Sequence, residues 1–288
     1  MIGIIGGSGL YQLEGLTDTH WEAIASPFGA PSDELLFGQM DGQRIVFLPR
    51  HGRGHKLSPS DINYRANIDV LKRVGVTDIL SVSAVGSLKE NLKPGTFVIV
   101  DQYIDRTILR ERSFFGKGCV AHVSMAHPTC SRLSGHIYQA AKKLGIDAVL
   151  GGTYLAMEGP QFSTLAESEM YRSLNCDVIG MTNIPEAKLA REAEMCYTSI
   201  AMVTDYDCWH PDHDNVTIQQ IIDTLTDNAA RAKALVKEII PRFHADSAAG
   251  TCACRFALDN AIITPPADRD PEMVLRLDAV ARRIFKNS

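Results

Sequence analysis

The 288-residue sequence has no surplus of basic residues, few aromatic side chains and no long apolar run. Its 29 Lys and Arg residues stand against 34 Asp and Glu residues, so the net charge is −5. A chain with this balance lacks the cationic surface that holds a polyanion by counterion release. No apolar stretch approaches the roughly 18 residues that cross a bilayer. We therefore expect neither a nucleic acid nor a membrane as a partner.

Signs of a secreted, disulfide-rich protein are also missing. Seven cysteines are too few for a disulfide scaffold in a chain of this length, and their odd number leaves at least one unpaired. The opening residues Met1–Ile5 are too short and uncharged for a secretory leader. We expect a cytoplasmic protein with one large core, in keeping with 45% hydrophobic and 22% charged residues.

What the sequence does contain is an alternation of short apolar runs with amphipathic segments. The runs are nearly continuous and rich in β-branched residues, which is typical of strands buried on both faces; they cover 2–5, 45–48, 78–82, 97–100 and 199–203. Helical spacing of apolar residues predicts helices over 62–74, 133–143, 165–174, 185–194 and 217–240. The alternation predicts an α/β fold: a single-domain, three-layer α/β/α architecture with a central mixed β-sheet flanked by helices.

The domain organisation is predicted from the lack of any linker before residue 242. Residues 1–242 are expected to form one domain, and residues 243–288 a C-terminal tail of different composition. An amphipathic helix is predicted over 272–285, with Val274, Leu277 and Val280 on one face. That face has to pack on its own chain or at a subunit interface.

Polar residues gather where the predicted strands end. Gly6-Gly7-Ser8-Gly9 follows the first strand, Arg50-His51-Gly52 the second, and Ser83–Ser87 closes the third. Loops at the carboxyl ends of strands build the ligand site in α/β sheets. Backbone N–H groups, hydroxyls and a guanidinium at such an edge are suited to an oxyanion.

Two rival interpretations of these motifs fail on single positions. A dinucleotide fingerprint needs a glycine where Gln12 stands, which argues against an NAD-dependent dehydrogenase. His51 and His55 are four residues apart, but no further ligand follows at metal spacing, so no metal site is expected.

Three later segments add further candidates. Glu158–Phe162 is a polar loop with one aromatic residue, and Ser163 or Thr164 after it is suited to an N-cap. Thr182 opens the next helix and serves either as its cap or as an anion ligand. Asp205 and Asp207 directly follow the last strand, where buried carboxylates are costly without a partner, so they are expected to face a ligand.

Together these motifs resemble those of the trimeric purine nucleoside phosphorylases. The matching segments run in order and at family spacing over residues 1–242: Gly6–Gly9, Arg50–Gly52, Asn63–Asn67, Ser83–Ser87, Glu158–Phe162, Met181–Thr182 and Asp205–Trp209. Within the family, the resemblance is to the branch that acts on 5′-methylthioadenosine. It implies cleavage of that nucleoside by inorganic phosphate, the co-substrate, to adenine and 5-methylthioribose 1-phosphate. No metal or organic cofactor is implied, and the alternative substrates are 6-oxopurine nucleosides or methylthioinosine.

The resemblance implies a role for each matching residue. The implied phosphate ligands are Ser8, Arg50, His51, Ser83, Ala84 and Thr182. Ser8 and Ser83 stand where many relatives carry Thr, which keeps the hydroxyl donor.

On the nucleoside side, Asp205 is the implied acid that protonates purine N7, which requires a pKa raised by a dry pocket. Asp207 is implied to accept from the 6-amino group, and relatives that prefer 6-oxopurines carry Asn at the Asp205 position. Phe162 is implied to pack on the purine and Met181 to contact the ribose. The implied methylthio pocket consists of His122, Ile218, Ile221 and Ile222. Gln161 replaces a frequent Arg.

The resemblance also implies a homo-oligomer, either a trimer or a dimer of trimers, in which residues of a neighbour close the methylthio pocket. Cys130, Cys196 and Cys208 match positions that hold reduced thiols in relatives. Cys252-Ala253-Cys254 resembles a tail that forms disulfides in some heat-stable members. Free thiols and disulfides are therefore both open from the sequence.

Overall fold

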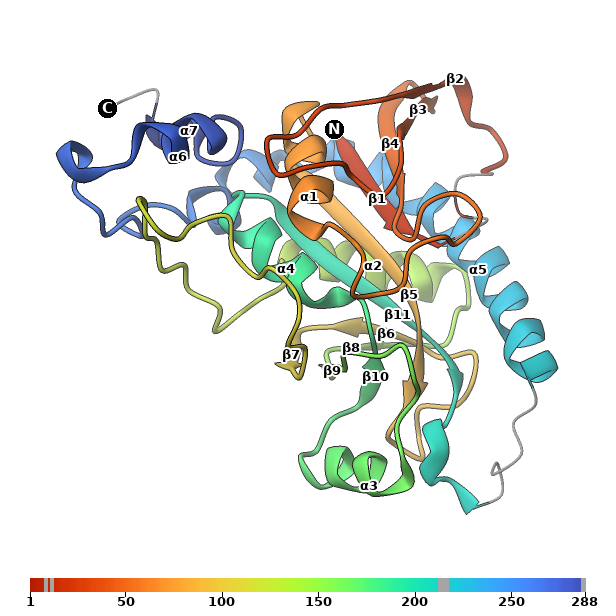
Figure 1. Ribbon diagram of the computed structural model, residues 1–288. Coiled ribbons are helices and arrows are strands. Elements are labelled where there is room, and N and C mark those ends of the chain that lie inside the picture. Colours follow the sequence, from red (N-terminus) through yellow and green to blue (C-terminus); the bar gives the residue numbers. More distant parts are fainter. Residues whose placement is uncertain (8–9, 11–12, 212–217, 286–288) are drawn as a thin grey trace.

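The computed structural model describes residues 1–7, 10, 13–211 and 218–285, and a mixed sheet of eleven described strands forms its centre (Figure 1). The strands are β1 (Ile2–Gly6), β2 (Thr17–Glu22), β3 (Leu35–Met40), β4 (Gln43–Pro49), β5 (Asp78–Ser87), β6 (Phe97–Val100), β7 (Gln102–Asp105), β8 (Ala148–Leu150), β9 (Thr153–Ala156), β10 (Val178–Gly180) and β11 (Cys196–Asp205). The α-helices are α1 (Tyr64–Arg73), α2 (Ser131–Lys143), α3 (Leu165–Ser173), α4 (Asn183–Glu192), α5 (Ile218–Ala245), α6 (Pro271–Arg276) and α7 (Arg282–Phe285). Short 3₁₀ turns include η1 (Asp207–Trp209), η3 (Ser247–Thr251), η4 (Ala253–Phe256) and η5 (Pro266–Asp268).

Four neighbouring strands share one direction and end at one edge of the sheet. β1 pairs in parallel with β4 and β5, and β5 pairs in parallel with β11. β5 and β11 are each ten residues long and extend well past the apolar runs that predicted them. Their extensions bring Gly86 opposite Asp205, after a register shift between Val203 and Asp205. This edge carries the candidate site.

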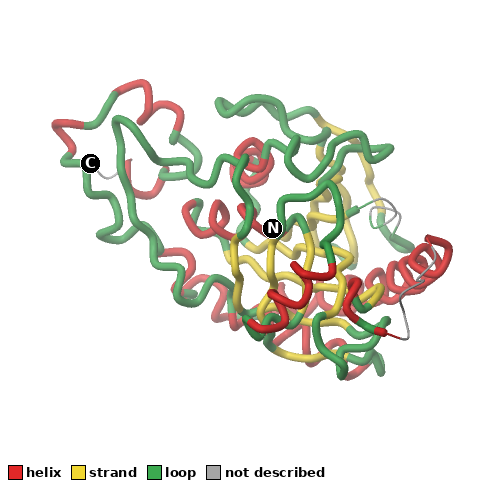
Figure 2. Tube along the Cα trace, turned by 60° about the horizontal axis from the view of Figure 1, so that its bottom comes forward, coloured by secondary structure: helices red, strands yellow, loops and turns green. Residues whose placement is uncertain are grey.

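Helices cover both faces of the sheet and so give the predicted three layers. α1 packs against α4 on one face, and α2 packs against α5 on the other. Each pair closes its own apolar cluster against the strands. The turned view in Figure 2 shows the strands gathered between the helices. The three-layer α/β/α prediction is confirmed.

All five predicted helices before the tail are present, with small differences at their ends. Thr164 is the N-cap of α3, and it forms a capping box with Glu167. Gly75 follows α1 at φ +89°, a conformation that suits glycine at a helix end. α5 extends through Pro241 to Ala245, beyond the predicted end, and Phe243 in this extension is buried.

The tail differs from the prediction of a single helix over 272–285. That prediction is wrong, because the structure has two short helices, α6 and α7, joined by a turn. Leu277 and Val280, at and within the turn, are buried in the core of their own chain. Packing rather than helix propensity fixes so short a segment. The domain boundary after residue 242 stays a prediction.

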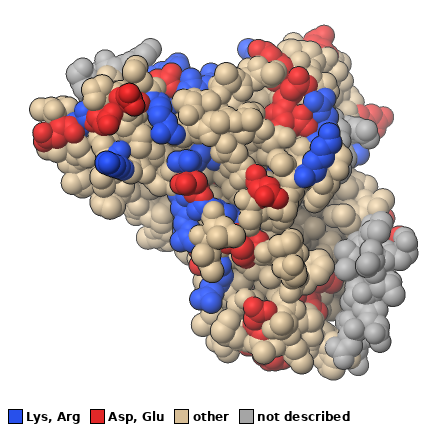
Figure 3. Space-filling model, viewed as in Figure 1, with Lys and Arg blue, Asp and Glu red and all other residues tan. Residues whose placement is uncertain are grey.

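The surface carries both signs of charge. Acidic and basic side chains are interspersed over the face shown in Figure 3. None of the helices in the described part of the chain has an apolar stretch long enough to cross a membrane.

Candidate active site

A buried ion pair lies at the sheet edge where β4 ends. Arg50 follows β4 directly and is 2% exposed, and Glu186 in α4 is 1% exposed. Arg50 Nε donates to Glu186 Oε1 over 2.7 Å, and Nη2 donates to Oε2 over 3.2 Å. Glu186 raises the pKa of Arg50, although burial acts in the opposite direction. The bidentate geometry fixes the guanidinium plane.

Polar side chains from the sheet complete the hydrogen bonding of this pair. Ser81 Oγ accepts from Arg50 Nη2 over 2.6 Å and donates to Glu186 Oε2 over 2.7 Å. Tyr197 Oη donates to the same carboxylate oxygen over 3.0 Å. Arg50 Nη1 donates to the Val82 carbonyl over 2.9 Å. Nη1 carries two hydrogens, and this carbonyl is the one acceptor it has among the described residues, so a second hydrogen is available to an anion.

Asn183 links this network to the next candidate, Ser83. Its Nδ2 donates to Ser81 Oγ over 3.0 Å and to Tyr197 Oη over 2.9 Å. Its Oδ1 accepts from Ser83 Oγ over 3.2 Å. Thr182, the N-cap residue of α4, is next to Asn183 in the chain, and its hydroxyl makes no capping hydrogen bond. The structure therefore brings Arg50, Ser83 and Thr182 together.

The remaining phosphate candidates flank this group. Ala84 is the one exposed residue in β5, which shows where the sheet edge opens to solvent. Burial and the adjacent Arg50 charge lower the pKa of His51 to about 4, so the ring is neutral near pH 7. His51 Nδ1 donates to the Leu57 carbonyl over 2.9 Å, which leaves the lone pair on Nε2. Ser8 lies outside the described residues.

A second group of polar side chains lies at the end of β11, opposite Gly86 of β5, which is three residues beyond Ser83. The Asp205 carboxylate accepts from Thr204 Oγ1 over 2.7 Å and from the Asp207 backbone N–H over 2.8 Å. Burial raises the pKa of Asp205, and burial also raises the pKa of Asp207. A Cβ at Gly86 would lie 3.1 Å from Asp205 Oδ1 and 3.3 Å from Asp207 Cβ, so this glycine makes room for both.

The loop before α3 is held by a buried arginine that the sequence did not single out. Arg110 donates to the carbonyls of Glu158, at 2.9 Å, and Ile184, at 2.7 Å, and also to that of Met181. Hydrogen bonds from Ser60 and two backbone N–H groups lower the pKa of Glu158 to about 2, against the effect of burial. Arg110 thus fixes the position of Met181 relative to the 157–160 loop.

Met181 contacts the loop before α3, and Phe162 lies in that loop. The Met181 sulfur lies so close to Gly159 that a Cβ there would be 2.5 Å away. Phe162 is 80% exposed. The carbonyl of the next residue, Ser163, accepts from the Cys208 thiol over 3.4 Å, which ties this loop to the residue after Asp207.

Of the four methylthio candidates, His122 is the one whose contacts the structure describes. His122 lies on a segment that pairs with the tail: its backbone N–H donates to the Ala261 carbonyl over 2.9 Å. Figure 1 shows the tail on the opposite side of the molecule from α3. Ile218, Ile221 and Ile222 belong to the first turns of α5, and their side chains lie outside the described residues.

Comparison with known proteins gives the family. A sequence model of the phosphorylase superfamily matches residues 1–241. The chain belongs to the phosphorylase superfamily. It is 59% identical to the S-methyl-5′-thioadenosine phosphorylase of Cereibacter sphaeroides over 99% of both chains. It is 61% identical to the enzyme of that name from Bradyrhizobium diazoefficiens, over 99% of this chain and 98% of the other.

Solved structures of the superfamily agree in fold. A methylthioadenosine phosphorylase from an antarctic soil metagenomic library superposes with a TM-score of 0.92 at 46% identity, covering 97% of this chain and 98% of that one. The Schistosoma mansoni methylthioadenosine phosphorylase in complex with adenine has a TM-score of 0.84 at 34% identity, covering 91% and 98%.

The sequence did not single out four residues that build this phosphorylase site. Glu186, Asn183, Tyr197 and Arg110 are all buried polar side chains that orient other candidates. One signal was available: Ser81 and Ser83 alternate along an apolar strand and so share one face. Two hydroxyls on a buried face need polar partners from the helix above it.

Proposed function

We propose that this protein cleaves 5′-methylthioadenosine with inorganic phosphate, giving adenine and 5-methylthioribose 1-phosphate. The names of relatives that are 59% and 61% identical over 99% of this chain support the substrate. The main support for the chemistry is the half-buried pair Asp205 and Asp207. Asp205 lies opposite Gly86, three residues along β5 from Ser83 of the Arg50 network. Two subsites at this spacing are suited to a nucleoside and an anion.

On the phosphate side, the residues position an anion rather than activate it. Phosphate takes the second hydrogen of Arg50 Nη1 and the hydroxyl of Thr182, with Ser8 as a further ligand. The Ser83 hydroxyl, which donates to Asn183 Oδ1 in this structure, turns to donate to phosphate instead. The Nε2 lone pair of neutral His51 accepts from a protonated phosphate oxygen. Because Glu186 already neutralises Arg50, the site contributes aligned donors more than net charge.

On the nucleoside side, a phosphate oxygen forms a bond to C1′ as the bond from C1′ to N9 breaks. The electron pair of that bond passes to the purine ring, and protonated Asp205 delivers its proton to N7. Asp207 accepts a hydrogen bond from the 6-amino group. A 6-oxopurine presents a carbonyl there and meets repulsion from the carboxylate, which makes 6-oxopurine nucleosides the poorer alternative.

Three further proposals accompany the reaction. No metal or organic cofactor takes part in it. The protein works as a homo-oligomer, a trimer or a dimer of trimers, in which His122 of one copy serves the pocket of another; the exposure of Ile108 and Leu109, at 78% each, supports a covered apolar face. Seven free cysteines suit a reducing compartment, so we place the protein in the cytoplasm.

The test of the reaction is adenine release from 5′-methylthioadenosine by the pure protein, with and without inorganic phosphate. Adenosine and methylthioinosine run in parallel. We expect release to require phosphate and to be fastest with 5′-methylthioadenosine. Release without phosphate would make the protein a hydrolase, and a preference for methylthioinosine would overturn the roles of Asp205 and Asp207. Sedimentation of the same sample tests the oligomer, since a fully active monomer contradicts it.

A further inference from the structure

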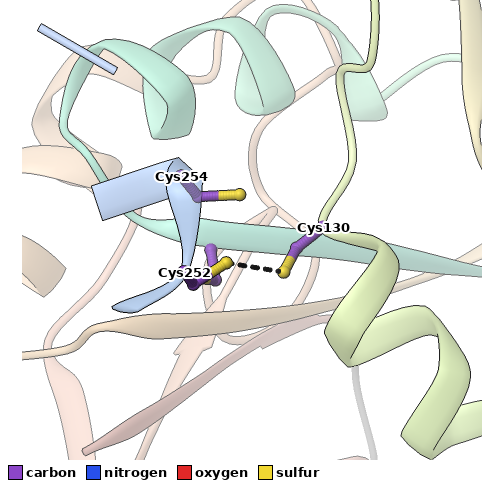
Figure 4. A group of neighbouring side chains, drawn as sticks. Cys130, Cys252 and Cys254 are labelled. Atoms are coloured by element: carbon purple, nitrogen blue, oxygen red, sulfur yellow. Dashed lines mark hydrogen bonds between the residues drawn. The ribbon is translucent and has the colours of Figure 1, made fainter. Parts of the chain in front are cut away.

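Four cysteines that are far apart in the sequence meet at one place away from the candidate active site. Cys130 immediately precedes α2, Cys196 begins β11, and Cys252 and Cys254 come from the tail. Their four sulfur atoms all lie within 4.8 Å of one another. Cys130 and Cys252 are separated by 3.6 Å between sulfurs, the contact drawn in Figure 4. Among the described residues this is the one group of ligand-type side chains close enough to hold a metal ion.

The arrangement has the dimensions of a tetrahedral thiolate site. A Zn²⁺ ion with bonds to sulfur of about 2.3 Å places its four ligands about 3.8 Å apart. The observed sulfurs reach that arrangement with shifts of about 1 Å or less. Cys130, Cys196 and Cys254 are buried, and Cys252 is half-buried, so a path for the ion exists on one side. Because all four sulfur atoms lie close to one another, one Zn²⁺ ion at their centre can bind all of them.

A cationic side chain borders the sulfurs. Arg132 donates through Nη1 to Asp246 over 2.7 Å and through Nη2 to Asp78, while its Nε is buried without a hydrogen-bond partner among the described residues. Arg132 also lies within interaction range of the sulfurs of Cys196 and Cys252. An N–H donor beside the sulfurs is what a thiolate-bound metal needs in its surroundings.

We propose that Cys130, Cys196, Cys252 and Cys254 bind one Zn²⁺ ion in a closed structural site. Binding replaces the four S–H bonds by four bonds from sulfur to zinc and releases four protons to solvent, without any change of oxidation state. Four protein ligands leave no open position, so the ion holds the fold and takes no part in the chemistry of the nucleoside. It joins the tail to α2 and β11.

The first test is titration of the reduced, metal-free protein with Co²⁺, followed by absorption. We expect the thiolate charge-transfer band and the visible bands of tetrahedral cobalt, saturating at one ion per chain. Zn²⁺ should remove these bands, and four of the seven thiols should become protected from a thiol reagent. Zinc analysis of protein purified without chelator should give one ion per chain.

Matched variants decide which thiols are responsible. Cys252→Ser and Cys254→Ser should weaken the affinity for Co²⁺ by more than about a hundredfold, since losing even an outer-shell partner costs about 10- to 100-fold. Cys176→Ser, which removes a buried thiol outside the cluster, should leave the titration unchanged. Zinc should raise the melting temperature of the wild type and of Cys176→Ser, but not that of Cys252→Ser.

Two results would overturn the proposal. One is the absence of tetrahedral cobalt bands in a reduced wild-type protein whose seven thiols are all titratable. The other is a protein that, as purified, is lighter by four hydrogen atoms, with two disulfides among these cysteines. Both measurements use the wild type, so they hold even if a variant fails to fold.

Discussion

The two halves of the candidate site differ in how completely one chain builds them. Around Arg50 and Glu186 every hydrogen-bond partner among the described residues is buried and comes from β1, β5, β11 or α4. Around Asp205 the residues are half-buried, Phe162 is 80% exposed, and His122 lies on a segment paired with the tail. The phosphate half is therefore preorganised within a single chain, whereas the nucleoside half has an open side. This difference predicts that substitutions in the first half damage folding as well as turnover, and that those in the second half damage turnover alone.

The largest effect is expected from Glu186→Gln. The substitution leaves the Arg50 charge buried without its counter-ion, which costs about 3–5 kcal/mol when a buried pair is broken. Denaturant unfolding measures the loss of stability, and initial rates should show the KM for phosphate rising more than that for the nucleoside. Glu169→Gln, which removes a surface ion pair of 3.5 Å with Arg172, is the control and should change neither. A stable variant with normal phosphate kinetics would contradict the prediction.

Next in size is Asp205→Asn, which should lower kcat/KM for 5′-methylthioadenosine by about 10²- to 10⁴-fold, the usual contribution of a general acid. Stability should stay close to that of the wild type. Because burial raises the pKa of Asp205, the wild type keeps its active protonated form to higher pH and loses activity as pH rises through that pKa. The Asn variant should lack this basic limb.

The matched control is Asp18→Asn, an exposed position at φ 52° in β2, where Asn tolerates the same backbone conformation. Unchanged turnover of 5′-methylthioadenosine by Asp205→Asn would refute the acid role.

A smaller effect is expected from Gly86→Ala. The added methyl group crowds Asp205 Oδ1 and Asp207 Cβ, which must shift by a few tenths of an ångström. Because a displacement of about 1 Å at a catalytic group costs on the order of 100-fold in rate, we expect a loss smaller than that. The KM for phosphate should not change, since Ser83 and Arg50 are untouched. Gly135→Ala serves as the control, because a Cβ there meets nothing within 4 Å. If the KM for phosphate changed as much as turnover of the nucleoside, the phosphate half and the nucleoside half of the site would not be independent.

The smallest effect is expected from Phe162→Ala. Packing on the purine stabilises substrate and transition state alike, so the KM for the nucleoside should rise about tenfold while kcat stays constant. Unfolding by heat should be unaffected, because the side chain is 80% exposed and leaves no cavity. Leu275→Ala, at 73% exposure in α6, is the control for loss of an exposed apolar side chain.

The two halves also differ in how far the sequence predicted them. Arg50 and Ser83 follow or lie within strand-like runs, and the rule that strand ends meet placed them at one edge of the sheet. Thr182 stayed open between a helix cap and an anion ligand, and the family resemblance alone added it to the phosphate set. Glu186 and Asn183 were not singled out, because a polar residue at a helix start has an adequate explanation as a surface or capping group. Only the packing of α4 against β5 in the structure shows that the side chains of Glu186 and Asn183 contact Ser81.

The thiol cluster was even less predictable from the sequence than Glu186 and Asn183. No spacing in the sequence relates Cys130 and Cys196 to the Cys252-Ala253-Cys254 segment, since long-range packing alone brings them together. The two tail helices were likewise misjudged, because the apolar spacing of Leu277 and Val280 fits a continuous helix and a turn equally well.

The extended backbone of β5 also helps to set the length of the candidate site. Ser83 and Gly86 lie on the same extended strand, and three residues of strand span roughly 10 Å. The separation between the anion end and the purine end is therefore set by the extended backbone of β5 and by the register of β11 against it, and repacking of side chains does not alter it. Insertion of a single residue between positions 83 and 86 would change this interval and reverse which face each later side chain occupies. The strand backbone thus determines the length of the substrate that fits the two subsites.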